Sequence, residues 1–170
     1  MRLETRRQRY ENKKKIAKTY PVEVCTINFQ VEENLGFVIR SAACFGVSTV
    51  NVIGSIPAHK YLAGKSATTH ELVNINQFSN PHQFLNYAKE NNIRLISAEL
   101  DDEAVNIHDY KFAPGERICI IVGHETSGIP VEILNASDKV YIPMPGSGFC
   151  LNTSQACNIF LYEAAKSYAR

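Results

Sequence analysis

The sequence predicts an α/β fold in which a mostly parallel sheet is covered by helices on both faces. Three observations lead to this prediction. Short runs of strand-forming residues alternate along the chain with segments of helical periodicity. The runs are continuously apolar, most clearly at 117–122, as in strands that are buried on both faces. Two of them end in polar, Gly-rich loops, which is where α/β folds bind ligands.

The first half of the chain begins with a β-rich run at 22–29. A helix is expected over 34–45, with Asn34 as its N-cap and Gly46 just after its end. Its apolar residues recur with helical spacing, at Leu35, Val38, Ile39 and Ala42. The segments that follow are expected to be a short buried strand, an irregular stretch and a further short strand, at 49–53, 55–70 and 72–75.

The second half continues the alternation. Residues 81–91 are helical by composition, 93–98 form a strand, and 99–110 are ambiguous, with one helical turn as the candidate. The remaining expected elements are a strand, a short helix that starts at Pro130, a last strand and a last helix, at 117–122, 130–135, 139–142 and 152–168. The last helix is predicted from one apolar stripe, formed by Cys157, Phe160, Leu161, Ala164, Ala165 and Tyr168.

Size and composition are those of an ordinary soluble globular domain. A chain of 170 residues buries about 70% of its unfolded surface, so it needs no disulfide or metal for stability. No run reaches the length of a membrane span, and the charged N-terminal segment lacks the apolar stretch of a secretory signal. The five cysteines form no C-x-x-C pair. We therefore expect no metal and a reducing, cytoplasmic location.

Charge is distributed unevenly along the chain. Residues 1–20 hold eight basic and two acidic side chains, a net charge of +6, whereas residues 21–170 hold ten basic and fifteen acidic ones, a net charge of −5. We expect residues 1–20 to be a basic arm and residues 21–170 to be the globular domain. Such an arm suggests a polyanionic partner, nucleic acid first. The alternative is a solvated, partly helical extension.

A first candidate site lies on the expected helix 34–45. Gly36 in its first turn costs about 1 kcal/mol of helix stability relative to Ala, but it lets another backbone or a ligand approach closely. We expect Arg40 to lie off the apolar stripe, on a face shared with Asn34 and Gly36. There its guanidinium could bind a phosphate through two hydrogen bonds. The alternative is a capping Asn and a solvated Arg.

A second candidate site is the loop from Gly123 to Gly128, which follows the strand at 117–122. The Glu125 carboxylate either meets a ligand there or caps the short helix that follows. His124 is either a general base or a solvated loop residue. No nucleotide motif explains this loop, since the chain contains no G-x-G-x-x-G.

A third candidate site follows the last strand. Two prolines flank Met144, so this segment cannot pair as a ladder strand. The last helix then opens with Asn152, Thr153 and Ser154, any one of which is sufficient as a cap. The surplus of polar side chains leaves room for a ligand at this position.

Together the three segments resemble the SpoU/TrmH branch of the SPOUT RNA methyltransferases. That pattern has an N-x-G-x-x-x-R helix, a G-x-E-x-x-G loop, and an I-P-M loop ending in S-L-N-x-S-x-A. The chain carries these residues in order across 22–168, as Asn34, Gly36, Arg40, Gly123, Glu125, Gly128, Ile142-Pro143-Met144, Leu151-Asn152, Ser154 and Ala156. The segments are specific because all three occur together.

The resemblance implies S-adenosylmethionine as the methyl donor and a ribose 2′-hydroxyl of RNA as the acceptor, with no metal. It also implies the SPOUT fold, in which the C-terminal segments form a trefoil knot, and a homodimer whose interface lies beside the site. The chain shows no sizeable separate RNA-binding domain. This favours a compact substrate such as tRNA, and ribosomal RNA remains the alternative.

The resemblance also implies site residues. The catalytic group would be Asn34, Arg40, Glu125 and Asn152. Arg40 would either activate the 2′-hydroxyl or, because Arg stays protonated in proteins, clamp a phosphate. The cofactor would lie against Leu100, Gly123, Ile142, Met144, Cys150 and Leu151.

Two departures from the family pattern bear on activity. Cys150 stands where the family usually has Ser, and a thiol is the weaker hydrogen-bond donor. Glu33 stands where Pro is often found, which we expect to be harmless. Two other functions are therefore kept beside the main one: a base methyltransferase on the same scaffold, which Asn34 and Arg40 oppose, and an inactive RNA-binding relative, which Cys150 encourages.

Overall fold

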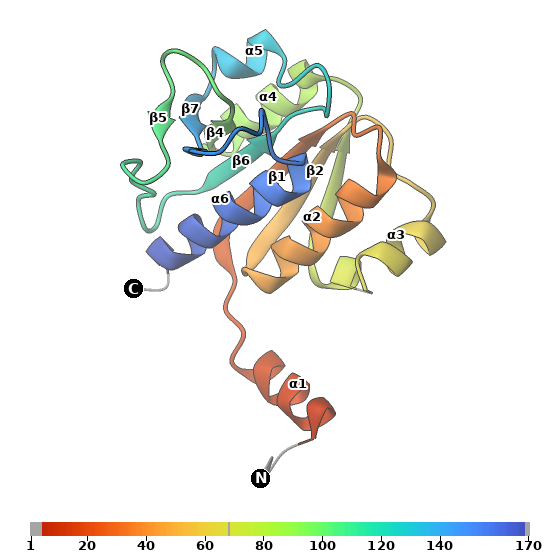
Figure 1. Cartoon of the computed structure of the whole chain (residues 1–170). Helices are drawn as coiled ribbons and strands as arrows, with labels where there is room; N and C mark the ends of the chain where they lie inside the picture. The colour runs from red at the N-terminus through yellow and green to blue at the C-terminus, as the bar shows by residue number, and fades with distance from the viewer. Residues whose placement is uncertain (1–4, 68, 169–170) are drawn as a thin grey trace.

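A seven-stranded sheet forms the centre of the protein in a computed structural model that describes residues 5–67 and 69–168 (Figure 1). The strand order is β3-β2-β1-β6-β4-β7-β5, and all neighbouring strands run in parallel. The predicted α/β class is therefore confirmed. The strands are β1 (Tyr20–Ile27), β2 (Val47–Ile53), β3 (Asn74–Phe78), β4 (Arg94–Ala98), β5 (Val105–Asn106), β6 (Ile118–Val122) and β7 (Asp138–Tyr141).

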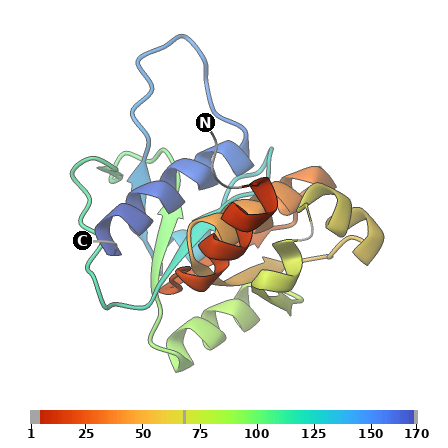
Figure 2. The same cartoon turned by 90° about the horizontal axis from the view of Figure 1, so that it is seen from below.

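Helices cover both faces of this sheet, as predicted (Figure 2). One face carries α2 (Glu32–Cys44) and α6 (Thr153–Tyr168), with α3 (His59–Lys65) packed against α2. The other face carries α4 (Pro81–Glu90) and the short α5 (Val131–Leu134). A 3₁₀ turn, η1 (Thr69–Leu72), precedes β3. Within the described residues, no helix has the length and apolar character needed to cross a bilayer.

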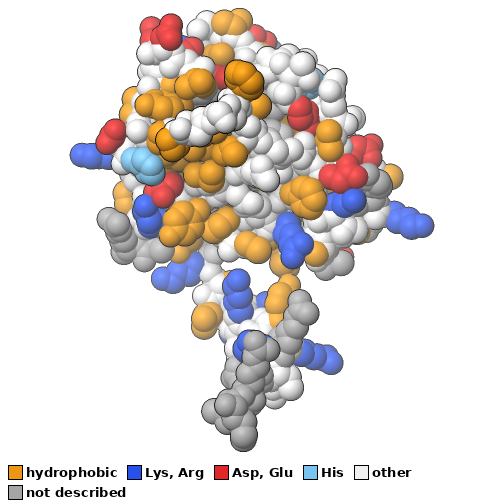
Figure 3. Space-filling model, in the orientation of Figure 1, with side chains coloured by type: hydrophobic (Ala, Val, Ile, Leu, Met, Phe, Trp, Pro, Cys, Tyr) orange, Lys and Arg blue, Asp and Glu red, His pale blue; other side chains and the backbone are white. Residues whose placement is uncertain are grey.

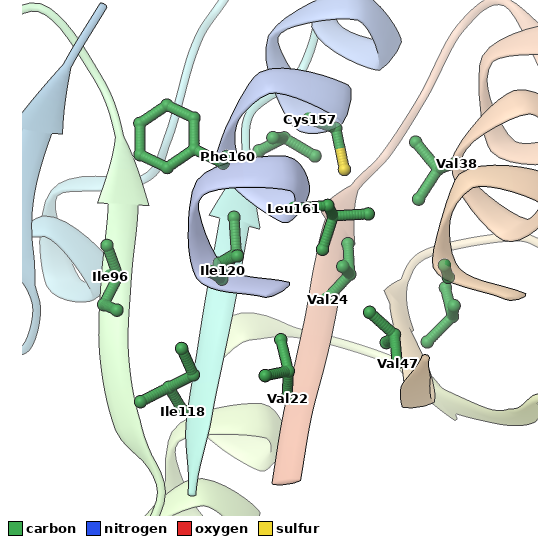
Figure 4. Close-up of a cluster of buried hydrophobic side chains, with 14 of the residues drawn as sticks. Val22, Val24, Val38, Val47, Ile96, Ile118, Ile120, Cys157, Phe160 and Leu161 are labelled. Atoms are coloured by element: carbon green, nitrogen blue, oxygen red, sulfur yellow. The ribbon is translucent and has the colours of Figure 1, made fainter. Parts of the chain in front are cut away.

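The larger part of the core lies between the sheet and the layer formed by α2 and α6 (Figure 4). Val24 of β1 and Ile120 of β6 are fully buried there against Val38 of α2 and Leu161 of α6. Neighbouring residues on these strands point to the opposite face. Cys25 and the other residues of that face pack under α4 and α5. Burial on both faces is the physical reason for the continuous apolar runs.

The topology places the polar loops at one edge of the sheet. The chain builds β2 and β3 on one side of β1 and then places β6 and β4 on the other side. A crevice forms outside the carboxyl ends of parallel strands at such a reversal. The loops that follow β4, β6 and β7 therefore meet at this edge.

Four local predictions were wrong. Residues 55–70 contain α3 and the start of η1 rather than an irregular stretch. Leu62 is the one buried apolar side chain among the α3 residues whose burial is described, so no apolar stripe marks this helix. The segment 99–110 contains β5, whose two residues are too few for any periodicity. The predicted strand 72–75 lies at 74–78 and has polar residues in an edge strand. The N-cap of α2 is Val31 and not Asn34, whereas Gly46 follows the helix with a φ of +73°, as predicted.

The helix α1 (Arg6–Lys15) projects from the amino end of β1, away from the layers (Figure 1). It begins with a capping box in which Thr5 and Gln8 exchange two hydrogen bonds, of 2.8 and 3.2 Å. Its last turn consists of three lysines, which interact favourably with the helix dipole. The implied trefoil knot stays a prediction of the resemblance.

Candidate functional site

A cavity of about 430 Å³ opens at the carboxyl ends of β4, β6 and β7. Four stretches of chain contribute to its lining, and each follows one of these strands or leads into α6. A volume of this size suits a small-molecule ligand. The stretches are 98–100, 122–126, 140–142 and 149–153, and Gly128, Met144, Ala156 and Phe160 complete the lining.

The loop after β6 is closed tightly on itself. His124 and Gly128 exchange two backbone hydrogen bonds, each of 3.1 Å. The His124 Nδ1 accepts the backbone N–H groups of Thr126 and Ser127, also at 3.1 Å. This nitrogen therefore carries no proton, and a neutral ring holds its proton on Nε2. A Cβ on Gly123 would lie 2.5 Å from the Gly128 carbonyl carbon, so only glycine fits there.

Glu125 reaches out of this loop and caps α2. Its carboxylate accepts the backbone N–H groups of Gln30 and Val31, at 3.0 and 3.2 Å, and the Asn34 side-chain amide at 2.8 Å. Val31, the N-cap residue of α2, makes no side-chain capping bond of its own. Of the two interpretations left open by the sequence, the capping of the short helix after this loop is therefore not observed. The carboxylate is held by a partner 91 residues away.

Hydrogen bonds keep Glu125 charged. Partial burial by itself would raise the pKa of this carboxyl group. The bonds donated by Gln30, Asn34 and Val31 outweigh that effect and hold the pKa below its ordinary value. The side chain is therefore an acceptor at neutral pH and not a proton donor.

Asn34 and Asn152 extend this arrangement to α6. Asn152 donates from Nδ2 to the Asn34 Oδ1 at 3.1 Å, across 118 residues of chain. Its own Oδ1 accepts the N–H and the hydroxyl of Ser154, at 2.9 and 2.6 Å, and so caps α6. Thr153 donates to the carbonyl of Gly123 at 3.0 Å. The surplus polar residues of this helix start thus bind other segments of the protein. We call Glu125, Asn34, Asn152 and Ser154 the site network.

Arg40 does not join the site network. Six residues correspond to about 240° around a helix, so it cannot share a face with Asn34. Asn34 is buried, whereas Arg40 is exposed and makes no hydrogen bond or ion pair within the described residues. Gly36 serves the packing of α2 on α3, because a Cβ there would lie 2.5 Å from the Lys65 Cβ. The expected shared face of these three residues was therefore wrong.

The six residues expected to hold a cofactor all line the cavity. Leu100 stands at its rim with 70% of its surface exposed, and the others follow β6 and β7 or precede α6. These positions are Leu100, Gly123, Ile142, Met144, Cys150 and Leu151.

Sequence reasoning missed three contributions to the site. The hydrogen bonds that the His124 ring accepts from Thr126 and Ser127 depend on the orientation of the ring, which no local sequence pattern indicates. The bond from Thr153 to Gly123 crosses 30 residues. Phe149 lines the cavity while almost fully exposed. The signal available in the sequence was an aromatic residue between Gly148 and Cys150, in the Gly-rich loop that leads into the last helix. Within the described residues, no group of three or more His, Cys, Asp or Glu side chains is placed to hold a metal ion.

Residues 21–162 match the model of the SpoU rRNA Methylase family. The chain is 30% identical over 149 residues to the tRNA (guanosine(18)-2′-O)-methyltransferase of Aquifex aeolicus, which covers 82% of this chain and 66% of that protein. It is 31% identical over 140 residues to the 23S rRNA (guanosine-2′-O-)-methyltransferase RlmB of Acinetobacter baylyi, covering 78% and 54%. The chain thus spans less than two thirds of the length of these relatives.

Solved structures share the fold. The TrmH/SpoU tRNA modifying enzyme of Aquifex aeolicus superposes with a TM-score of 0.78 at 25% identity, covering 95% of this chain and 83% of that one. The AdoMet-bound rRNA methyltransferase of Sinorhizobium meliloti superposes with a TM-score of 0.79 at 21% identity, covering 86% and 58%.

Proposed function

We propose that this chain, which belongs to the SpoU rRNA methylase family, transfers a methyl group from S-adenosylmethionine to a ribose 2′-hydroxyl of RNA. One observation carries the proposal: the site network joins three segments that are far apart in sequence, at the edge of one cavity. These are the same three segments that carry the family pattern. The names of the relatives support the reaction and favour tRNA over ribosomal RNA as the substrate.

The cavity fits the cofactor. Its volume is in the range of ligand sites, and its lining combines apolar side chains such as Leu100 and Met144 with the polar residues Glu125 and Asn152. Leu100 would pack near the adenine, and the backbones at Ile142, Met144 and Leu151 would bind its polar edges. When bound, S-adenosylmethionine supplies a methyl group on a positively charged sulfur that leaves as a neutral thioether, so the transfer needs no metal. Cys150 makes no hydrogen bond among the described residues, which supports its being a tolerated replacement.

The chain's own residues orient the acceptor. The site network holds α2 and α6 in one arrangement, so that Asn34, Glu125 and Asn152 act as a unit. Arg40, exposed and without a partner among the described residues, is available to clamp an RNA phosphate. Placement of reacting groups of this kind supplies several kcal/mol of a barrier, roughly 7–11 in well-oriented systems.

The test is transfer of labelled methyl from S-adenosylmethionine to total RNA that lacks this modification, followed by digestion to nucleosides. A 2′-O-methylnucleoside is the expected product. A base-methylated nucleoside would assign the other enzyme class. No transfer to any RNA by protein that binds the cofactor would refute the proposed activity and support an inactive relative.

Arg40→Ala separates the phosphate clamp from cofactor binding. We expect transfer to fall at least about 100-fold, because misplaced reactants lose about that factor. Cofactor affinity should stay within about twofold. Lys89→Ala is the matched control, since Lys89 is an exposed basic residue on α4, on the opposite face of the sheet. Equal loss of transfer and cofactor affinity would contradict the clamp.

A homodimer is the finer part of the proposal. Exposed apolar side chains gather over α6 (Figure 3). Tyr162 of α6 is 55% exposed and lies edge-on to Phe45, and Phe37 of α2 is 44% exposed. Apolar patches of this kind mark protein interfaces. Sedimentation should show a dimer for the wild type and a monomer for Tyr162→Glu; a monomeric wild type would contradict the interface.

The basic arm is proposed to contact RNA away from the cavity. α1 projects from the amino end of β1, whereas the cavity lies at the carboxyl ends of the strands. A helix of ten residues without a packed face is only marginally stable, and phosphate contacts would stabilise it. Deleting residues 1–17 spares the carbonyl of Lys18, which packs on Gly46. The deletion should weaken RNA binding and flatten its salt dependence. Unchanged affinity at low salt would show that the arm is solvated.

A further inference from the structure

Phe149 is the most exposed large hydrophobic side chain in the described part of the chain, with 96% of its surface accessible. Phenylalanine is normally buried. Here it lines the mouth of the cavity instead, three residues before Asn152, where the polar group that opens α6 begins. The site network and the expected cofactor contacts make no use of it.

The loop 143–151 holds this ring away from the body. Pro143 and Pro145 lack N–H groups, and no hydrogen bond to any residue of this loop is found among the described residues. A Cβ on Gly146 or Gly148 would meet nothing within 4 Å, so the loop faces open space at both of these positions. Figure 2 shows the segment between β7 and α6 extending beyond the helices. The ring is therefore presented to an incoming molecule.

An aromatic ring in this position suits an unpaired nucleobase. Proteins that bind single-stranded or looped RNA stack its bases on exposed aromatic side chains. Phenylalanine offers two apolar faces and no hydrogen-bonding group, so it binds any base without discriminating between them. A dimer contact accounts less well for Phe149, because the exposed aromatic groups of α2 and α6 lie on helices, whereas Phe149 stands on the loop that lines the cavity.

We propose that Phe149 is a stacking platform for an unpaired base of the RNA substrate, beside the ribose that is methylated. This inference rests on the proposed function. The ring would hold the base outside the cavity while its ribose enters. Arg40 and the arm would contribute phosphate contacts, which position RNA, and Phe149 would contribute the base contact.

The experiment compares Phe149→Ala, Phe149→Leu and Phe149→Trp in the full-length protein. The probe is unmodified tRNA made by transcription, and its affinity, KM and kcat are measured together with affinity for S-adenosylmethionine. We expect the Ala and Leu variants to bind tRNA about 5- to 100-fold more weakly, and the Trp variant to stay within about threefold of the wild type. Cofactor affinity should not change. Val131→Ala is the matched control, because Val131 is 66% exposed on α5, on the opposite face.

Four results would overturn the stacking platform: unchanged tRNA affinity in Phe149→Ala, full rescue by Leu, an equal loss of cofactor affinity, or dissociation of the Ala variant into monomers during sedimentation. The last would make Phe149 a subunit contact. Failure of the proposed function has a different signature, since the wild type itself would then transfer no methyl to RNA. Wild-type transfer with an equally active Phe149→Ala would remove the stacking inference alone.

Discussion

Two carboxylates, Glu125 and Glu23, show how similar hydrogen bonding can serve different purposes. Glu23 lies in β1 with no exposed surface and accepts hydrogen bonds from Asn51 at 2.7 Å and from the Arg117 Nε at 2.8 Å. Tyr87 of α4 donates to it as well. Glu125 is only half-buried and binds backbone N–H groups and one amide.

The partners of Glu23 belong to the structural layers. Asn51 is on β2, Arg117 precedes β6, and Tyr87 comes from the helix that covers this face. Burial, together with the nearby charge of Glu23, raises the pKa of the Tyr87 hydroxyl, so it stays a donor. None of these residues lines the cavity. This cluster neutralises a buried charge and ties the sheet to α4.

The partners of Glu125 belong to the loops and helix starts at the cavity. Complete hydrogen bonding therefore does not by itself mark a functional carboxylate. The distinguishing features are partial exposure, a position at the cavity, and partners that come from the other segments of the family pattern. Four changes test this distinction.

Glu23→Ala should have the largest effect, and on stability. Removing the carboxylate leaves the buried Asn51 amide without its acceptor and a cavity in its place, which together cost about 3–5 kcal/mol. The free energy of unfolding measured with urea should fall by about that much. Methyl transfer per folded molecule should be retained, because the cluster is remote from the cavity. Glu116→Ala serves as the control: its ion pair with Arg94 is exposed and worth below about 1 kcal/mol. A loss of methyl transfer in folded Glu23→Ala would contradict the distinction between Glu23 as a structural carboxylate and Glu125 as a functional one.

Glu125→Gln should have the opposite effect, with a small loss of stability and a large loss of methyl transfer. The amide offers one acceptor oxygen instead of two, so its NH2 group must face either the Gln30 N–H or the donors of Val31 and Asn34. The free energy of unfolding should fall by only about 1–2 kcal/mol, whereas methyl transfer should fall about 100-fold through misplacement of Asn34. Stability is measured with urea and transfer under single-turnover conditions. A variant as active as the wild type would place Glu125 among the purely structural carboxylates.

We expect His124 to support methyl transfer by holding the loop 123–128 in position. Loss of its two hydrogen bonds in His124→Ala should lower transfer about 30-fold, since two bonds worth roughly 1 kcal/mol each correspond to that factor. His124→Asn should recover most of the rate, because an Asn Oδ1 can accept the same N–H groups. Comparable activity of the Ala and Asn variants would argue against this role.

The pH dependence of stability should show the smallest effect. Because the pKa of folded Glu125 is lowered, its contribution to stability is complete above its ordinary value of about 4.3 and is lost as the pH falls through the lower folded value. The difference in unfolding free energy between wild type and Glu125→Gln should therefore be constant from pH 7 to about 5 and shrink below about 4.3. If the difference in unfolding free energy persisted at the lowest pH at which both proteins fold, the charge of the Glu125 carboxylate would not be its source.

The elements that sequence predicted well are those with a buried stripe of their own. α6 and α2 bury apolar residues at helical spacing, and β6 is buried along its whole length. The elements that were missed or displaced, α3, β3 and β5, show little burial among their described side chains. Hydrophobic periodicity arises because one face of an element is buried, so it gives no signal for an element that buries little.

The sequence by itself determined the α/β class, the order of most elements and three segments that resemble one family, because residue type and spacing are local properties. Only the tertiary structure decided that Glu125 caps α2, that Asn34 joins Asn152, and that Arg40 and Asn34 lie on different faces. These contacts link residues up to 118 positions apart. The partner of a polar side chain depends on how the whole chain folds, so local sequence patterns do not predict it.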